Sequence, residues 1–138
     1  MLAPLGPVYQ AGTLSGNPLA TAAANATLDI LGQKFTYERL ESSAALLEAG
    51  LADVAKEAGV AVTINRLGSI MSCFFTGKPV QNFADVQSTD IKRFKKFFAR
   101  MLKQGIYLAP SAYEAMFVSL AHSKADIEKT IEAAKNSF

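Results

Sequence analysis

The sequence has very little of what builds a metal centre or a disulfide framework. Its 138 residues include one cysteine, Cys73, and one histidine, His122. A single cysteine excludes an internal disulfide and a metal site made of several cysteines, and it fits a reducing compartment. With no second histidine, and with Cys73 far away in sequence, neither a metal site nor a Cys–His nucleophile pair is supported. We therefore expect no metal, and we expect His122 to bond to the backbone at a helix start.

An excess of charge and a long apolar run are also missing. Lysine and arginine number 14 and aspartate and glutamate 12, so the formal net charge is +2, which by itself implies no acidic partner. No apolar stretch approaches the ~20 residues that span a bilayer. The first seven residues contain two prolines and no basic stretch, unlike a signal peptide. These absences predict a cytoplasmic protein that binds no membrane.

Positive charge is concentrated in one segment, predicted as a helix over about 89–104. It carries six basic residues: Lys92, Arg93, Lys95, Lys96, Arg100 and Lys103. A nucleic-acid-binding helix is one interpretation. The other is a solvated face opposite an apolar stripe that includes Ile91 and Phe94. Because the net charge is small and no ladder of stacking aromatics is present, we expect the solvated face and no nucleic acid.

Half of the residues are hydrophobic and 19% are charged, which excludes a disordered chain and allows one core. Capping residues and apolar spacing predict helices over 17–31 and 37–58, the helix over about 89–104, and a last helix that follows Ser123. Short apolar runs predict strands over 60–64, 69–76, 106–109 and 115–120. Short strands close together favour an α+β fold, a small antiparallel sheet with helices packed on one face.

The apolar stripes of the predicted helices name the candidate core. Cys73 is expected as a small buried hydrophobe in the second strand, with Phe74 and Phe75 beside it. The helical stripes contain Leu40, Ala44, Leu47, Leu51, Val54 and Ala58, then Ile91, Phe94, Phe98, Met101 and Leu102, and finally Ile127, Ile131 and Ala134.

The segment from Gly12 to Pro18, Gly-Thr-Leu-Ser-Gly-Asn-Pro, is the most informative motif. Two glycines bracket two hydroxyl residues directly before a helix that Asn17 caps and Pro18 begins. Free N–H groups, a close backbone approach at Gly12 and the Thr13 hydroxyl together suit an oxyanion such as phosphate. The segment is not a P-loop, since no lysine follows its second glycine. The alternative is an ordinary turn into a helix.

Glu114 is the second candidate. It follows Pro110-Ser111-Ala112-Tyr113 and precedes an apolar strand, away from any amphipathic helix face. A carboxylate at a strand entrance can point into a cleft. The alternative is a surface turn residue, and spacing alone does not decide between the two.

Longer segments resemble one family, the glutamate-1-semialdehyde 2,1-aminomutases of the class III aminotransferase group. Residues 6–20, Gly-Pro-Val-Tyr-Gln-Ala-Gly-Thr-Leu-Ser-Gly-Asn-Pro-Leu-Ala, closely match the family's pattern, and so do residues 104–111 and 119–122, the latter Ser-Leu-Ala-His. The shorter Gly-Asn-Pro-Leu-Ala is common to class III enzymes, whereas Tyr9-Gln10-Ala11 before Gly12 is typical of the aminomutases. The resemblance covers essentially the whole chain and corresponds to the C-terminal third of the family's sequence.

The resemblance implies a function and a set of roles. Members are fold-type I pyridoxal-phosphate enzymes that convert glutamate-1-semialdehyde to 5-aminolevulinate in tetrapyrrole synthesis, in the cytoplasm or, in plants, the plastid stroma. Gly12 and Thr13 match the loop that reaches the cofactor phosphate of the neighbouring subunit in a homodimer. Glu114 matches a carboxylate near the bound small-molecule substrate. Residues 1–36 would be a loop and helix at the edge of the large cofactor domain, and 37–138 the C-terminal small domain.

One departure from the family pattern is large. The family's cofactor-attaching lysine lies upstream of Gly12, and no lysine of this sequence occupies a matching position. We therefore expect the chain to be a C-terminal fragment, inactive by itself and without bound pyridoxal phosphate. Two alternatives remain: a fragment of another class III aminotransferase, and a stand-alone, non-catalytic α+β interaction module.

Overall fold

Helix α1 (Pro18–Leu31) begins where the sequence predicts it, because Asn17 and Pro18 fix its start. The Asn17 side-chain oxygen accepts hydrogen bonds from the N–H groups of Leu19 and Ala20, at 3.0 and 3.2 Å. The computed structural model describes residues 1–138 and divides into two units, Met1–Thr36 and Tyr37–Phe138. Helix α1 belongs to the first unit and has no buried residue there. The first unit therefore has no core of its own.

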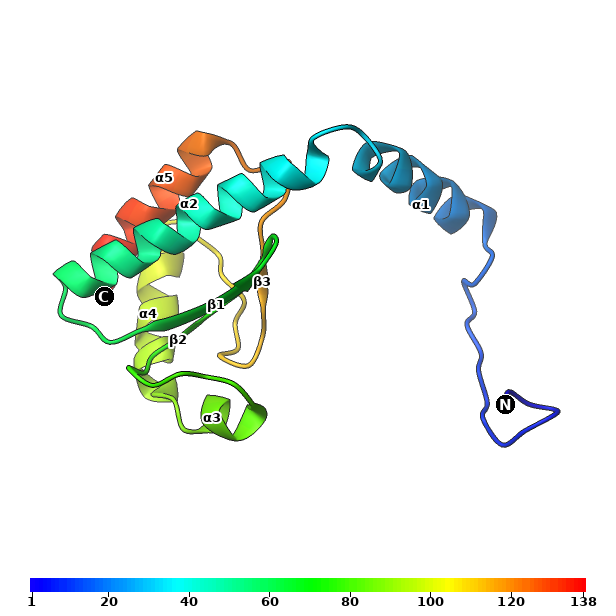
Figure 1. The fold of residues 1–138 in the computed structure, drawn as a ribbon, viewed down its shortest axis with the longest axis horizontal. Coiled ribbons are helices and arrows are strands. Elements are labelled where there is room, and N and C mark those ends of the chain that lie inside the picture. Colours follow the sequence, from blue (N-terminus) through cyan, green and yellow to red (C-terminus); the bar gives the residue numbers. More distant parts are fainter. The chain divides into compact units, whose positions relative to one another are not determined.

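The second unit contains a sheet and most of the helices (Figure 1). Strands β1 (Thr63–Leu67), β2 (Ile70–Phe74) and β3 (Met116–Phe117) form an antiparallel sheet in the order β1-β2-β3. The helices are α2 (Thr36–Glu57), α3 (Phe83–Gln87), α4 (Ile91–Lys103) and α5 (Lys124–Lys135). The predicted α+β fold with a small antiparallel sheet is confirmed.

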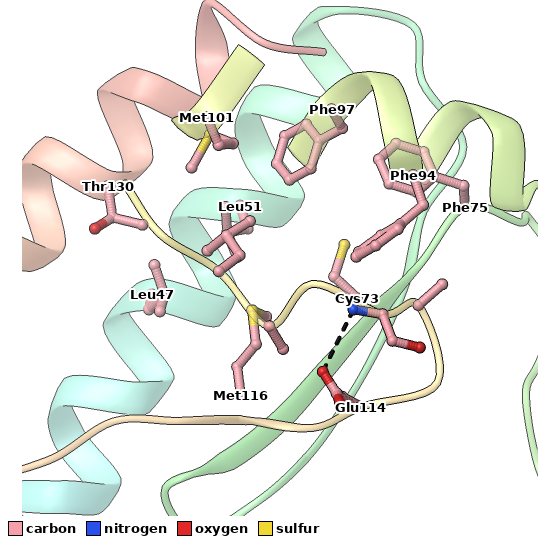
Figure 2. Close-up of a pocket in the computed structure, with 14 residues that line it drawn as sticks. Leu47, Leu51, Cys73, Phe75, Phe94, Phe97, Met101, Glu114, Met116 and Thr130 are labelled. Atoms are coloured by element: carbon pink, nitrogen blue, oxygen red, sulfur yellow. Dashed lines mark hydrogen bonds between the residues drawn. The ribbon is translucent and has the colours of Figure 1, made fainter. Parts of the chain in front are cut away.

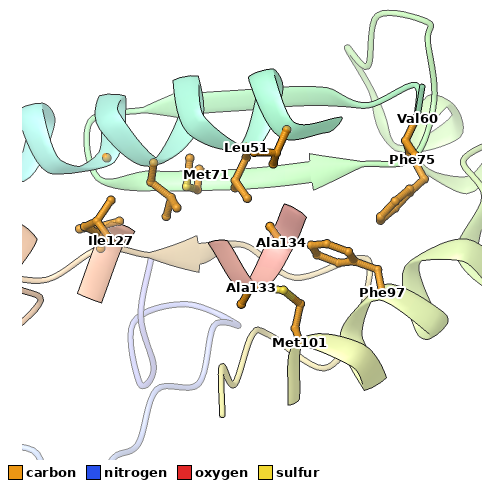
Figure 3. Packing of buried hydrophobic residues seen from close by; sticks show 13 residues of the cluster. Leu51, Val60, Met71, Phe75, Phe97, Met101, Ile127, Ala133 and Ala134 are labelled. Carbon is orange, nitrogen blue, oxygen red and sulfur yellow. The ribbon is translucent and has the colours of Figure 1, made fainter. Parts of the chain in front are cut away.

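One face of the sheet forms the core with α2, α4 and α5. The register pairs Ile64 with Cys73 and Arg66 with Met71, so these four side chains share a face. Figure 3 shows side chains from all three helices converging on this face. The buried cluster includes Leu47 and Leu51 of α2, Met71 and Phe75 at β2, Phe97 and Met101 of α4, and Ile127, Ala133 and Ala134 of α5. The helices thus bury one sheet face, as predicted.

Two ion pairs and one close helix contact hold α2 against the rest of the second unit. Arg66 of β1 donates to Glu48 through Nε and to Glu41 through Nη1, both at 2.6 Å, and these hydrogen bonds raise the pKa of Arg66, that to Glu48 most strongly. At Gly50, an added Cβ would lie 2.3 Å from the Cδ1 atom of Ile131, so glycine permits the close approach of α5.

The second predicted strand, over 69–76, is observed as the slightly shorter β2, and the other three predicted strands differ more. The first begins at Thr63 instead of Val60, because the Val60 N–H donates to Ala55 O at 2.9 Å and Gly59 adopts a left-handed φ of +66°. This closure belongs to the end of α2. Residues 106–109 form no strand, and the predicted strand over 115–120 shrinks to two residues of β3. Only the β1–β2 hairpin therefore has full-length strands.

Two local features differ from the prediction. Helix α4 begins at Ile91 with Asp90 as its N-cap, and helix α3 was not predicted although Asn82 and Asp85 form its capping box. The prediction that His122 bonds to the backbone at a helix start is confirmed, since its Nδ1 accepts from the Ser119 N–H at 3.0 Å just before the Ser123 cap of α5.

The stripes of the helices were predicted almost correctly. Ala58 and Leu102 are exposed, and Phe97, which was not predicted, is 4% exposed and takes a central place in the core. Phe74 and Phe75 are buried as expected, and Cys73 is partly buried. The six basic residues of the α4 segment are all exposed, so the solvated face is confirmed.

Hydrogen exchange should separate the two units. The amides from Tyr9 to Ser15 lie in an exposed segment without a core, whereas Phe74 lies in a paired strand against the cluster, so the Phe74 amide should exchange far more slowly. Amide-resolved exchange monitored by NMR or mass spectrometry measures the difference. Equal protection of the Tyr9–Ser15 amides and of Phe74 would contradict the division.

The start of α5 should be sensitive to pH. Hydrogen bonds from the Ser123 hydroxyl (2.7 Å) and backbone N–H (2.8 Å) lower the pKa of Asp126 below its ordinary 3.8. Because the folded state favours the ionised carboxylate, Asp126 adds to the free energy of unfolding above pH 3.8. This contribution is lost as the pH falls through the lowered pKa of the folded state. Asp126→Asn should therefore lower the melting temperature at pH 7 and have little effect near pH 2. Asp53→Asn, at an exposed position of α2, is the matched control, and an equal effect of Asp126→Asn at both pH values would contradict the assignment.

Candidate functional site

The loop before α1 is built from two consecutive turns. The Ser15 N–H donates to Gly12 O at 3.1 Å, and the Asn17 N–H donates to Leu14 O at 3.0 Å. Gly16 has a φ of +73°, a left-handed conformation that favours glycine. An added Cβ at Gly12 would lie 2.2 Å from the Ser15 Oγ atom, so another residue there would require the Ser15 side chain to move. Gly16 is therefore favoured by its backbone conformation and Gly12 by its close approach to Ser15.

The donors of this loop are free. The backbone N–H groups of Gly12 and Thr13 donate no hydrogen bond within the chain, and the Thr13 side chain is exposed and unbonded. In contrast, the side chain of Asn17 already occupies two N–H groups at the start of α1. An oxyanion at this loop would therefore accept hydrogen bonds from Gly12 and Thr13. The N–H groups at the start of α1 are less available than the sequence indicated.

Glu114 lies in the second unit, at the turn that leads into β3. Its Oε2 accepts from the Ser111 N–H at 3.3 Å, while its own N–H donates to Ser111 O at 3.1 Å. The Tyr113 N–H donates to the Ser111 Oγ at 3.2 Å, which tightens the same turn. Ser111 was not singled out from the sequence, although Ser-x-x-Glu is a capping pattern that could have indicated it. The exposed Glu114 carboxylate thus closes its own turn.

A narrow apolar cavity of about 30 Å³ lies beside this turn (Figure 2). Glu114 stands at its edge, and the sheet and helices supply the other walls, among them Leu51, Cys73, Phe97 and Met116. A space of this size holds about one water molecule. The cavity is too small for a substrate, so Glu114 would meet one only on its exposed side.

Cys73 should be nearly inert in the folded chain. Burial raises the pKa of its thiol to about 12, and the thiolate is the nucleophilic form. At pH 8 the folded chain should react with a thiol reagent roughly a thousandfold more slowly than the chain unfolded in urea. The release of a chromophore from an aromatic disulfide reagent measures both rates. Comparable rates in the two states would contradict the burial of the sulfur.

No lysine occupies an enclosed position: every lysine of the chain is exposed. No group of three or more His, Cys, Asp or Glu side chains could hold a metal ion. None of the helices is long and apolar enough to cross a membrane. The residues present therefore fit the phosphate end of a cofactor, through Gly12 and Thr13, and provide no attachment point for its ring.

Comparison with known proteins assigns the family. The model of the class III aminotransferases matches residues 1–138, the whole chain. The chain belongs to the class III aminotransferase family. Among its relatives in this family, the glutamate-1-semialdehyde 2,1-aminomutase of Desulforamulus reducens is 55% identical over 138 residues. The chain spans 32% of the length of that relative, about a third.

Solved structures of an aminomutase and of transaminases share the fold. A glutamate-1-semialdehyde aminomutase from Pseudomonas aeruginosa superposes with a TM-score of 0.80 at 22% identity, over 97% of this chain and 30% of that one. A transaminase with PLP bound superposes with a TM-score of 0.76 at 19% identity, over 94% of this chain and 29% of that one. At these identities the likeness supports the fold alone.

Proposed function

We propose that the chain is the C-terminal part of a glutamate-1-semialdehyde 2,1-aminomutase, an isomerase that forms 5-aminolevulinate for tetrapyrrole synthesis. The observation that carries this proposal is the 55% identity to a protein of that name across all 138 residues. The whole enzyme would act in the cytoplasm, which agrees with the single cysteine. The present chain would be inactive alone, because it spans about a third of that relative.

Gly12 and Thr13 would bind the phosphate of pyridoxal phosphate. Two free backbone N–H groups and one free hydroxyl lie on consecutive residues, a donor set that suits a phosphate dianion. In a homodimer, this loop would reach the cofactor of the neighbouring subunit. The exposed position of the loop supports such a role, since its donors face no group of their own unit.

Glu114 would act beside the substrate, on the open side of its turn. Its bond to the Ser111 N–H is long, at 3.3 Å, so the carboxylate can leave that amide for a stronger, charged partner at modest cost. A carboxylate in this place can hold the substrate's amino group or a proton near it. Pyridoxal phosphate, when bound, supplies the electron sink for moving the amino group, and the protein supplies binding, orientation and proton transfer.

A second function is an amino transfer to an oxo acid, as in other class III enzymes. The match of the class III aminotransferase model to residues 1–138 favours it. The two functions differ in their product, because an aminomutase returns the amino group to the same carbon skeleton. A third possibility is a non-catalytic interaction module. In that case, an enzyme whose C-terminal third is replaced by this chain should be inactive.

A chimeric enzyme tests these functions. The last third of the Desulforamulus reducens aminomutase is replaced by this chain, and the product from glutamate-1-semialdehyde is identified by mass spectrometry. We expect 5-aminolevulinate at a rate within about tenfold of that of the parent. A folded, cofactor-loaded chimera that transfers its amino group to an added oxo acid and makes no 5-aminolevulinate would favour the second function. A folded chimera with neither activity would overturn both.

A further inference from the structure

A cleft of about 420 Å³ runs beside α4, where basic side chains of this helix meet aromatic residues at the edge of the core. Four of the basic side chains line it, Lys92, Arg93, Lys96 and Arg100, and Phe75, Phe97 and Phe138 add an aromatic wall. Positions three and four apart on a helix share a face, so Lys92, Arg93, Lys96 and Arg100 lie together, while Lys95 lies off that face. Lys103 is the last residue of α4, one turn beyond Arg100, and does not line the cleft. The arrangement is a basic pocket with an aromatic side.

The charges of this cleft have no partners in the chain. The ion pairs of the structure involve Arg66, Lys124 and Lys135, and none includes a basic residue of α4. Asp90, which also lines the cleft, is engaged as the N-cap of α4 and accepts from the Arg93 N–H at 2.9 Å. Even with Asp90 and the α-carboxylate of Phe138 counted, the cleft keeps a surplus of positive charge.

The aromatic wall is fixed by its own contacts. The Phe138 ring stacks on Phe97 with centroids 4.6 Å apart and 25° between the planes. The preceding residue, Ser137, is held by Arg100 Nη1, which donates to its carbonyl oxygen at 3.1 Å, and by Gln104, which donates to its hydroxyl at 2.7 Å. Because one bond occupies only part of the Arg100 guanidinium, the remaining N–H groups can serve a ligand.

We propose that this cleft binds a polyphosphate, either inorganic or carried by a nucleoside. Several adjacent cations without carboxylate partners match a ligand with several adjacent negative charges, and arginine and lysine together are the usual phosphate-binding pair. A nucleoside ring would find Phe138 at the edge of the cleft, where aromatic stacking adds affinity. This site uses none of the residues of the phosphate loop, Gly12 and Thr13, and it does not depend on the proposed enzyme function.

Two charge-matched double variants test the site by isothermal titration of the 138-residue chain with sodium tripolyphosphate. Arg93→Gln with Lys96→Gln removes two cations that line the cleft, and Lys95→Gln with Lys103→Gln removes two from the same helix outside it. All four side chains are exposed, and Arg100 is left in place because it holds Ser137, so both variants should fold. We expect the first pair to weaken binding by on the order of tenfold and the second by less than about twofold.

Equal losses in the two variants would show a general attraction to a basic helix and overturn the proposal, as would the absence of binding at millimolar tripolyphosphate. Titration with magnesium-free ATP distinguishes the two sources of the ligand. Tighter binding of ATP, with Phe138 ring resonances that shift with ATP and not with tripolyphosphate, assigns the cleft to nucleotides. Equal affinities and unmoved Phe138 resonances assign it to inorganic polyphosphate.

Discussion

Pyridoxal phosphate added to the isolated 138-residue chain should form no stoichiometric adduct at a single lysine. Every lysine is exposed, so no lysine is enclosed by groups that would hold the cofactor beside it. The proposed phosphate contacts at Gly12 and Thr13 would bind the cofactor without placing a lysine beside its ring. Visible absorbance during the titration, followed by borohydride fixation and peptide mapping, measures the outcome. Weak labelling spread over several lysines is expected.

The same labelling of the urea-unfolded chain is the control, and the folded chain should not exceed it at any lysine. One lysine labelled stoichiometrically at micromolar cofactor would contradict the prediction. It would mean that the chain contains a complete cofactor site, although it spans only about a third of the length of the aminomutase that it matches.

Thr13→Val in the chimeric enzyme should raise the dissociation constant for pyridoxal phosphate by about tenfold to a hundredfold. The Thr13 hydroxyl has no partner in the chain, so it is free to donate to the phosphate, and hydrogen bonds to charged groups contribute roughly 1.5–3 kcal/mol. Valine keeps the shape of the side chain and removes the donor. Cofactor titration followed by fluorescence gives the constant, and the thermal stability of the apo-protein should be unchanged.

Thr27→Val is the matched control for this substitution. Thr27 is also exposed, and its hydroxyl bonds to Ala23 O inside α1, away from the loop. The control should leave the cofactor affinity unchanged. If Thr13→Val also leaves the affinity for pyridoxal phosphate unchanged, Gly12 and Thr13 form only a turn into the helix and do not bind the phosphate.

Local chemistry made the helices predictable. Asn17 and Ser123 mark helix starts because their side chains accept hydrogen bonds from N–H groups only a few residues away. Pro18 marks one because its fixed φ suits the first helical position and no intrahelical bond is lost there. Both signals can be identified from adjacent positions in the sequence. The strands were harder to predict, since pairing depends on residues distant in sequence. Val60 belongs to a β-branched run, yet the closure of α2 takes its N–H, and the tertiary context overrides its propensity.

The candidate site was predictable to different degrees in its two parts. The order of residues from Gly12 to Asn17 indicates a tight turn with free donors, and the structure adds that the donors belong to Gly12 and Thr13. For Glu114, the sequence left a cleft carboxylate and a turn residue open. The structure shows the carboxylate bonded to the Ser111 N–H in its own turn, and its proposed role toward a substrate stays a prediction.

The most direct test of the proposed function asks whether Thr13 of one subunit serves the cofactor of the other. Chimeric subunits carrying Thr13→Val are mixed with chimeric subunits that keep Thr13 and lack the cofactor-attaching lysine of the upstream part. Formation of 5-aminolevulinate is measured at a cofactor concentration between the dissociation constants of the wild-type and Thr13→Val chimeras. If the loop acts across the dimer, each heterodimer holds one complete site, and activity should rise well above that of either parent alone. If the mixture shows no more activity than the sum of its parents, no site combines the lysine of one subunit with Thr13 of the other, and the proposed role of this chain is wrong.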